Sequence, residues 1–214
     1  MNTRYLYVRF QHLASAAMLF AVSAGLVSAA TPVPANLNPA TVTSGSYEVE
    51  PSHTRVQFSV SHMGFTDWYG DLIGASGTLL LNPKNISGSK VDISIPTASL
   101  STTNAKLDEE LRGSQWFDTK AYPTIRFVST KVIQTKPGVA AIVGNLTFHG
   151  VTRPVTLQAR FNGAGINPLD KSYTVGFNAT TAILRSDFGL GNYVPLIGDT
   201  TELRISAAFV RTGQ

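Results

Sequence analysis

The sequence contains no cysteine, which excludes disulfide frameworks, thiol catalysis, cysteine-ligated zinc and a lipid-modified N-terminal cysteine. Charge is scarce as well. Lys, Arg, Asp and Glu make up 14% of the 214 residues, against about a quarter in a typical globular chain. The formal net charge of +4 is too small to form the basic stripe that follows a phosphate backbone. We therefore expect no nucleic-acid partner.

The start of the chain has the pattern of a secretory signal peptide. The first twelve residues carry two arginines and no acidic residue, and residues 13–27, LASAAMLFAVSAGLV, are apolar or small. Small residues then offer a cleavage site after Ala29 or after Ala30. An uncleaved membrane anchor is the alternative, but the apolar run is shorter than the ~20 residues of a membrane span. Residues 1–29 thus predict export, and a cysteine-free exported domain fits the bacterial periplasm.

Cleavage would remove two of the 17 basic residues and none of the 13 acidic ones, so the mature charge would be 15 minus 13, or +2. Residues 30–46 contain three prolines and no charge, a composition that predicts a disordered linker. The remaining residues, 47–214, are enough for one domain that buries about 70% of its unfolded surface.

Strict alternation of apolar and polar residues dominates this domain. In residues 53–62, Val56, Phe58 and Val60 alternate with polar residues, which is the period of a half-buried strand. Similar or noisier patterns predict eight strands, at 53–62, 67–82, 90–95, 124–133, 139–148, 155–161, 173–179 and 202–209. One helix is expected from Asn104 to Arg112. The pattern predicts an all-β fold, a closed antiparallel barrel or a sandwich.

The inward face decides whether such a barrel is hollow or filled. Small residues occupy mid-strand inward positions at Gly144, Ala159, Ala179 and Ala207. If they cluster, the interior is hollow and would suit a lipid-like molecule. The alternative is that large neighbours fill the gaps, namely Phe58, Phe127, Phe161 and Phe177. The pattern alone leaves both open.

Motifs for catalysis or metal binding are missing. His53 and His62 lie nine residues apart on one strand, so they are roughly 30 Å apart and face opposite sides. The acidic run at 108–110 is typical of a solvated helix face. Neither a Gly-x-Ser-x-Gly elbow nor a dinucleotide-binding loop occurs. We therefore expect no catalytic residue, no metal and no cofactor.

A few polar residues lie among the apolar ones. His62 ends an inward row, either as a hydrogen-bonding group at a barrel rim or as a core histidine. Arg112 precedes an aromatic pair at 116–117, and Arg185 follows the seventh expected strand. Each arginine could bind a phosphate or polar head group, or could cover apolar surface with its stem.

Four collinear stretches, from about Tyr47 to Val210, resemble the YceI-like family, lipocalin-like polyisoprenoid-binding proteins of the bacterial periplasm. They are PSHTRVQFSVSHMGF (51–65), PTASLSTTNAKLDEELRGSQWFDTKAYPTIRF (96–127), GNLTFHGVTRPVTL (144–157) and TAILRSDFGLG (181–191). The resemblance implies an extended eight-stranded antiparallel lipocalin-like β-barrel with one short helix and an internal apolar cavity. The stretch 63–77 departs from the family pattern and inserts Trp68 and Tyr69 near the mouth.

The resemblance also implies a function and a site. The protein would be a periplasmic carrier of a polyisoprenoid or similar long-chain amphiphile, such as a quinone, a prenyl diphosphate or a fatty-acid derivative. Transient membrane contact is expected, and the chain would be a monomer or a homodimer. The implied ligand-binding residues are His62, Asn104, Arg112, Arg185, Phe58, Val60, Leu107, Leu111, Phe117, Phe127, Phe177 and Phe188.

Two other functions stay open at this stage. The protein could be an enzyme acting on the bound amphiphile, with His62 working beside Asp187 or Glu109. Alternatively, the barrel could be packed shut and serve as a stress-related structural or interaction protein.

Overall fold

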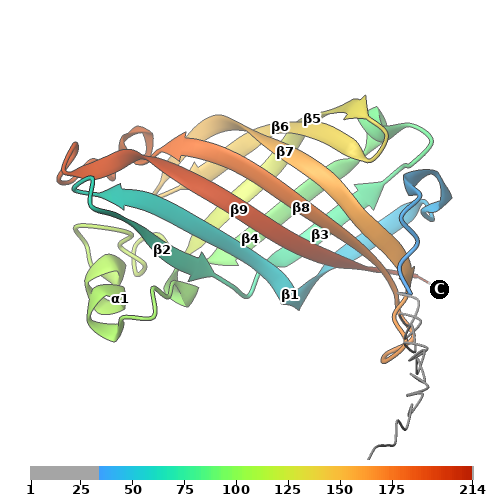
Figure 1. Cartoon of the computed structure of the whole chain (residues 1–214), viewed down its shortest axis with the longest axis horizontal. Coiled ribbons are helices and arrows are strands. Elements are labelled where there is room, and N and C mark those ends of the chain that lie inside the picture. The colour runs from blue at the N-terminus through green and yellow to red at the C-terminus, as the bar shows by residue number, and fades with distance from the viewer. Residues whose placement is uncertain (1–33, 214) are drawn as a thin grey trace, which may run out of the picture. The chain divides into compact units, whose positions relative to one another are not determined.

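The computed structural model describes residues 34–213. The expected signal peptide, its cleavage sites and the first part of the expected linker lie outside these residues. The described part contains nine strands and one α-helix, α1 (Ala105–Arg112). The strands are β1 (Gly45–His62), β2 (Thr66–Leu72), β3 (Ser76–Leu81), β4 (Lys90–Pro96), β5 (Thr124–Lys136), β6 (Val139–Phe148), β7 (Val151–Ile166), β8 (Tyr173–Leu184) and β9 (Ile197–Arg211). All pair antiparallel in one sheet (Figure 1).

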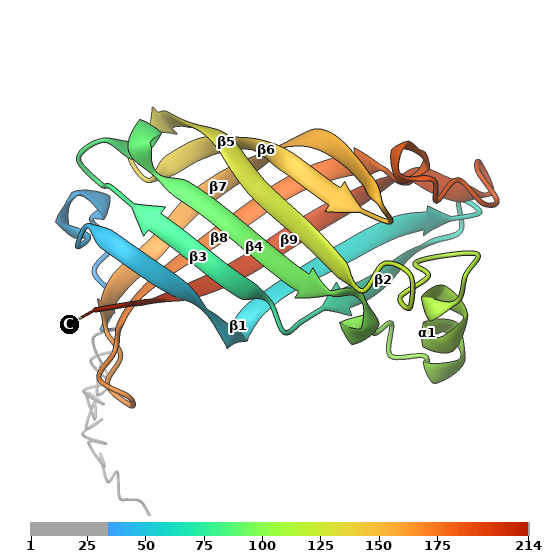
Figure 2. The ribbon, with the colours of Figure 1, turned by 180° about the vertical axis from the view of Figure 1, so that it is seen from behind.

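Pairing between the first and last strands closes the sheet into a barrel. β1 and β9 pair from Tyr47 opposite Arg211 to His62 opposite Ile197, with two register shifts. The closed ring runs β1-β3-β4-β5-β6-β7-β8-β9, and β2 lies beside the second half of β1 (Figure 2). The expected eight-stranded antiparallel barrel with one helix is confirmed. Closure pairs β9, which would otherwise be an unpaired edge strand, with β1.

The expected single strand at 67–82 is wrong in one respect. It breaks at residues 73–75, where Gly74 has a φ of 71°, a left-handed conformation that glycine adopts without strain. β2 therefore pairs with the second half of β1, whereas β3 pairs with its first half. Alternation alone does not show such a break, because apolar residues continue through it.

β1 bends sharply between its two halves. Its register with β9 shifts between Glu50 and Arg55, around Pro51, which has no backbone N–H to donate. The hydroxyl of Thr54 repairs the ladder there, because it donates to the Ala208 carbonyl (3.3 Å) and accepts from the Ala208 N–H (3.0 Å). Such a bulge increases strand bending and twist. The bent β1 can therefore pair with β3 along its first half and with β2 along its second half.

The helix is fixed at one end of the barrel by its own N-terminal residues. Asn104 caps α1 by accepting a hydrogen bond from the Leu107 N–H at 3.2 Å, as expected from the sequence. The buried Asp108 carboxylate accepts from the Thr102 N–H (2.6 Å) and hydroxyl (2.7 Å). Burial alone would raise the pKa of Asp108, but these hydrogen bonds, together with the charge of Arg112 and a hydrogen bond with Ser101, lower it. α1 and the preceding segment are thereby held together.

Residues 34–44 correct the expected linker. Asn36 pairs with Ala164 of β7, residues Pro39–Thr41 form a 3₁₀ turn, and Val42 is buried against the barrel. The expectation of disorder over 30–46 is therefore wrong for its described part. The prolines of this segment suggested disorder. Proline also favours ordered extended backbone, and that is how the segment packs.

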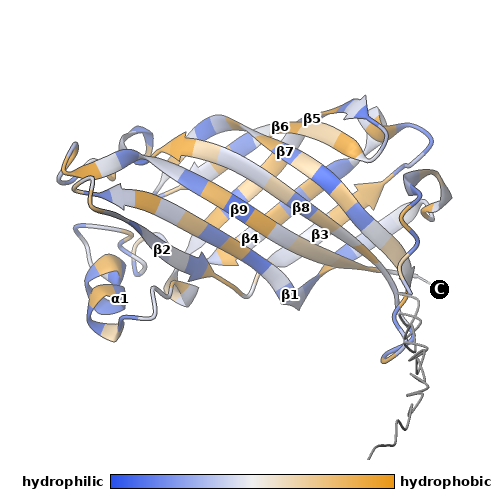
Figure 3. Cartoon of the chain, viewed as in Figure 1, coloured by the Kyte–Doolittle hydropathy of each residue, from blue (hydrophilic) through white to orange (hydrophobic). Residues whose placement is uncertain are grey.

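Hydrophobic and hydrophilic residues alternate along the strands (Figure 3), and the hydrophobic ones line the interior of the barrel. At the end opposite α1, Tyr47 and Val175 are fully buried in one cluster with Phe209. Burial raises the pKa of the Tyr47 phenol to about 12. Among residues 34–213, no helix combines the length and the hydropathy needed to cross a membrane.

One inward glycine is covered by an aromatic ring, and we predict that it tolerates no side chain. A Cβ at Gly144 would lie 2.4 Å from the Phe127 ring and 2.6 Å from the Val128 carbonyl oxygen. We expect Gly144→Ala to lower the free energy of unfolding by about 1–3 kcal/mol through overpacking, measured by urea titration. Gly176→Ala is the matched control because its Cβ would have no contact closer than 3.8 Å. Equal stability of both variants would contradict this packing.

Candidate ligand-binding cavity

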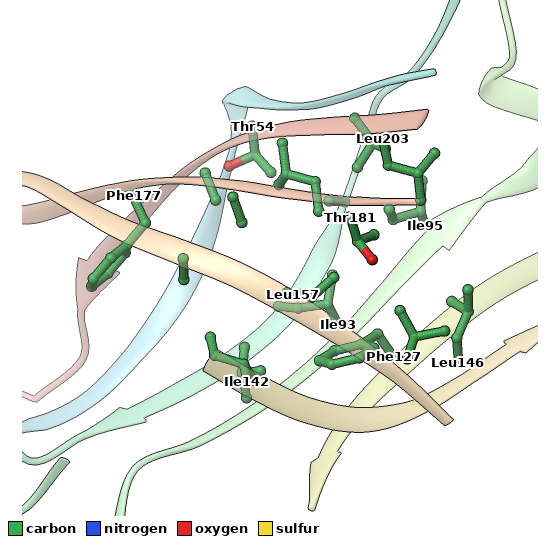
Figure 4. A pocket seen from close by; sticks show the side chains of 18 of the residues that line it. Thr54, Ile93, Ile95, Phe127, Ile142, Leu146, Leu157, Phe177, Thr181 and Leu203 are labelled. Atoms are coloured by element: carbon green, nitrogen blue, oxygen red, sulfur yellow. The ribbon is translucent and has the colours of Figure 1, made fainter. Parts of the chain in front are cut away.

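The middle of the barrel encloses a cavity of about 830 Å³, within the 300–1,000 Å³ typical of small-molecule sites. Its walls are almost entirely apolar and come from all sides of the barrel. Side chains from β4, β5, β7 and β9, including Ile93, Phe127, Leu157 and Leu203, point into one shared space (Figure 4). A void of this size does not fit the hypothesis of a barrel packed shut.

Small side chains create this space. Ala140, Ala159 and Ala179 lie directly opposite one another on β6, β7 and β8, and all three line the cavity. Ala207 lines it too, opposite Phe177. Of the two alternatives that the sequence left open, the structure shows clustering for three of the four small residues. Gly144 is the exception, because the Phe127 ring fills the place of its missing side chain.

Most of the expected ligand-binding residues lie on the cavity wall, although ligand contact itself stays a prediction. Ten line it, namely Phe58, Val60, His62, Asn104, Leu107, Leu111, Phe117, Phe127, Phe177 and Arg185. The two others, Arg112 and Phe188, do not.

Arg112 has a structural role. Its Nε–H donates to the Ala98 carbonyl at 3.2 Å, and its Nη2 donates to the carbonyl of the fully buried Leu100. The guanidinium therefore fastens the segment before α1 to the helix. The sequence could not show this, because the acceptors are backbone carbonyls.

Phe188 does not line the cavity, for a different reason. It is only 1% exposed and lies behind the cavity wall, with its ring centroid 5.7 Å from that of Phe148. Phe148 itself lines the cavity. Phe188 thus supports the wall and does not form it.

Arg185 lies at the α1 end of the cavity, but backbone carbonyls already take up much of its hydrogen-bonding capacity. Its Nε and Nη2 donate to the carbonyls of Gly198 and Ile197, both at 2.8 Å, and its Nη1 donates to the Leu190 carbonyl. Burial lowers the pKa of this guanidinium, while the nearby Asp199 carboxylate opposes the shift. Three of the five donors of the guanidinium thus hold the β8–β9 connection.

Two tryptophans stand at the same end, which we call the α1 mouth. Trp68 lies beside His62, with ring centroids 6.2 Å apart, and the Trp116 ring centroid is 5.8 Å from the Arg185 guanidinium carbon. Both tryptophans line the cavity, and the chain has no others. The expected position of Trp68 near the mouth is confirmed, whereas Tyr69 points outward and is 51% exposed.

Two threonines add hydroxyl groups to the cavity wall. Thr181 and Thr201 lie on neighbouring strands in diagonal positions on the inner face, about 7–8 Å apart in such geometry. The Thr181 hydroxyl makes only a long contact of 3.5 Å with the Ala182 carbonyl. Sequence reasoning missed both residues. Continuing the alternation of 173–179 for two more residues would have placed Thr181 inward.

The groups proposed for catalysis do not come together. Asp187 and Glu109 are exposed, and neither lines the cavity with His62. Among the described residues, no group of three or more His, Asp or Glu side chains is arranged to hold a metal ion.

Comparisons with known proteins agree with this architecture. The model of the YceI-like domain matches residues 47–209. The chain belongs to the YceI-like family. A curated relative, a UPF0312 protein of Pseudomonas savastanoi pv. phaseolicola, is 36% identical over 157 residues, which cover 73% of this chain and 81% of the relative.

Two solved structures share the fold. BcnA of Burkholderia cenocepacia superposes with a TM-score of 0.68 at 21% identity, covering 75% of this chain and 98% of BcnA. A polyisoprenoid-binding domain from Saccharophagus degradans, described as implicated in plant cell wall breakdown, gives a TM-score of 0.61 at 13% identity, covering 79% and 99%.

We predict that Arg185 acts on stability more than on ligand charge. Replacing it by Met would leave three backbone carbonyls without their charged donors and lower the free energy of unfolding by about 2–4 kcal/mol. Arg185→Lys keeps the charge but cannot reach all three carbonyls, so it should lie between Met and wild type. Urea titration measures both. A fully stable Arg185→Met variant that has lost binding of a lipid would contradict the structural role.

Proposed function

We propose that the protein is a periplasmic carrier that holds one long-chain amphiphile, of the polyisoprenoid type, inside its barrel. The observation that carries this proposal is the apolar cavity of about 830 Å³ enclosed by the β1–β9 closure. The family to which the chain belongs and the polyisoprenoid-binding neighbour support it. The signal-peptide pattern of residues 1–29 supports the periplasmic location.

Affinity for the tail follows from the composition of the walls. Each CH₂ group removed from water contributes about 0.8 kcal/mol, so a long tail needs only a continuous apolar surface. The alanines at 140, 159 and 179 leave space for it along one side, while Phe127 and Phe177 line the cavity elsewhere. No specific polar contact with the tail is required.

The head group should be uncharged. Burying an anion without a partner is costly, and Arg185, the buried cation at the α1 mouth, already donates to three backbone carbonyls. Lys90 and Lys106 line the cavity only where it reaches the surface, and both are exposed. The hydroxyls of Thr181 and Thr201 instead suit a carbonyl or hydroxyl, so a quinone or a long-chain alcohol fits better than a diphosphate or a fatty acid.

The first prediction of this proposal concerns the molecule that co-purifies with the protein. Solvent extraction and mass spectrometry of gently purified protein should detect a long-chain neutral lipid, and Ala159→Phe should lose most of it because the ring would occupy the cavity. Because the cavity has room, the stability of that variant should stay within about 1.5 kcal/mol of wild type. Ala182→Phe is the matched control, since Ala182 is exposed on the outer face of β8.

Two results would count against the carrier function. One is the repeated absence of any long-chain molecule from the wild-type extract. The other is an Ala159→Phe variant that is folded and carries as much lipid as the Ala182→Phe control.

A second prediction tests the head group with two molecules that share one tail. Geranylgeraniol should bind more tightly than geranylgeranyl diphosphate, by roughly tenfold or more, because the diphosphate would bury charge without a free partner. Both tryptophans of the chain line the cavity, so intrinsic fluorescence reports occupancy directly. Tighter binding of the diphosphate would show that a cationic group receives the head, and would refute the neutral-head assignment.

A further inference from the structure

The α1 mouth is bordered by large apolar side chains that face solvent. Phe65, in the β1–β2 turn, is 85% exposed, and Leu196, in the loop before β9, is 59% exposed. Met63 and Tyr193 are exposed to similar extents. A hydrogen bond of 2.7 Å from the Met63 N–H to the Leu196 carbonyl joins the turn to the loop. We call the segments 63–66 and 189–198 the rim; both views of the ribbon place them at the α1 end of the barrel (Figures 1 and 2).

The rim carries no charge. Residues 63–66 (MGFT) and 189–198 (GLGNYVPLIG) contain no ionisable acid or base other than the Tyr193 phenol, and the adjoining segment 113–117 (GSQWF) is equally uncharged. The opposite opening of the cavity is lined by Lys90 and Gln134. The two rim segments can therefore enter an apolar medium without desolvating a charge of their own.

The rim is held in its exposed conformation. The Trp116 and Tyr193 rings stack with centroids 6.0 Å apart, and the Asn192 side-chain amide donates to the Gln115 carbonyl. Met63 and Tyr193 have φ values of 55° and 61°, in the left-handed region that large side chains seldom adopt. Such strain concentrates at functional segments, and here it presents apolar side chains to solvent.

We propose that the rim is the surface by which the protein docks on a lipid bilayer, so that the ligand passes between bilayer and cavity through the α1 mouth. This inference rests on the proposed function. A bilayer is the occupant that the chemistry selects, because its outer zone accepts Trp and Tyr rings at the interface and apolar side chains beneath. The rim adjoins the cavity mouth, so a tail can pass without crossing water.

The charges at the α1 mouth determine whether the rim should prefer an anionic or a neutral bilayer. The cavity-lining charges nearest the rim on the helix side are Lys106 and Glu110, four residues apart on α1 and opposite in sign. They give no net field that would select anionic lipid. Docking should therefore need apolar insertion alone, should occur on neutral membranes, and should change little with salt.

The test compares variants of the chain as cells export and process it, so that any contribution of the N-terminal residues is the same in all. Flotation with pure phosphatidylcholine vesicles should recover wild type, and Phe65→Ser/Leu196→Ser should bind at least roughly tenfold more weakly, given the transfer free energy of two large side chains. Leu169→Ser is the matched control. Leu169 is 90% exposed in the β7–β8 turn, beside the charged residues Asp170 and Lys171, and its loss should change nothing.

Three results would overturn the docking surface. They are a wild-type protein that does not bind neutral vesicles, a double variant that binds like wild type, and a wild-type dimer that the double variant converts to monomer. The last would assign the rim to a second copy of the chain.

Uptake of a decyl-substituted benzoquinone from dilute solution, followed by tryptophan fluorescence without vesicles, separates the two proposals. The double variant should take up the quinone like wild type, because neither substituted side chain lines the cavity. Failure of uptake by every variant while flotation persists would refute the carrier function and not the docking surface.

Discussion

Backbone hydrogen bonding between β1 and β9 is the constraint on which the rest of the structure depends. Because these strands pair along nearly their whole lengths, the wall of the barrel is continuous and its stability does not require a filled interior. A closed sheet satisfies its own backbone groups, so small residues such as Ala159 and Ala179 can face a void. The bulge around Thr54 is part of the same device, because it lets β1 bend and still remain paired with β9.

Several polar side chains at the α1 end of the barrel are hydrogen-bonded to main-chain groups. Arg185 and Arg112 both donate to main-chain carbonyls, and Asp108 accepts from Thr102. Charges that might have received a head group are thus used to fix the loops and the helix around the mouth. Because these charged groups are bound to backbone groups, an uncharged amphiphile suits the interior better than a charged one.

The fold could be predicted from sequence because alternation reports burial directly. The alternating apolar residues of each strand, such as Phe58 and Val60 on β1, show which side of the strand faces the interior. Features set by single backbone conformations were missed, including the break at Gly74 and the ordered segment around Val42. That Arg112 and Phe188 do not line the cavity could not be predicted, because residue type shows neither which carbonyl an arginine reaches nor whether an aromatic ring lies in the wall or behind it.

The most direct test of the central claim is an electron-density map of the gently purified protein at a resolution that shows side chains. We predict continuous tubular density running from the α1 mouth, between Trp68 and Trp116, past Ala159 and Ala179, with any head-group oxygen near Thr181 or Thr201. An interior filled by rearranged side chains, or a ligand whose phosphate contacts Arg185, would contradict it.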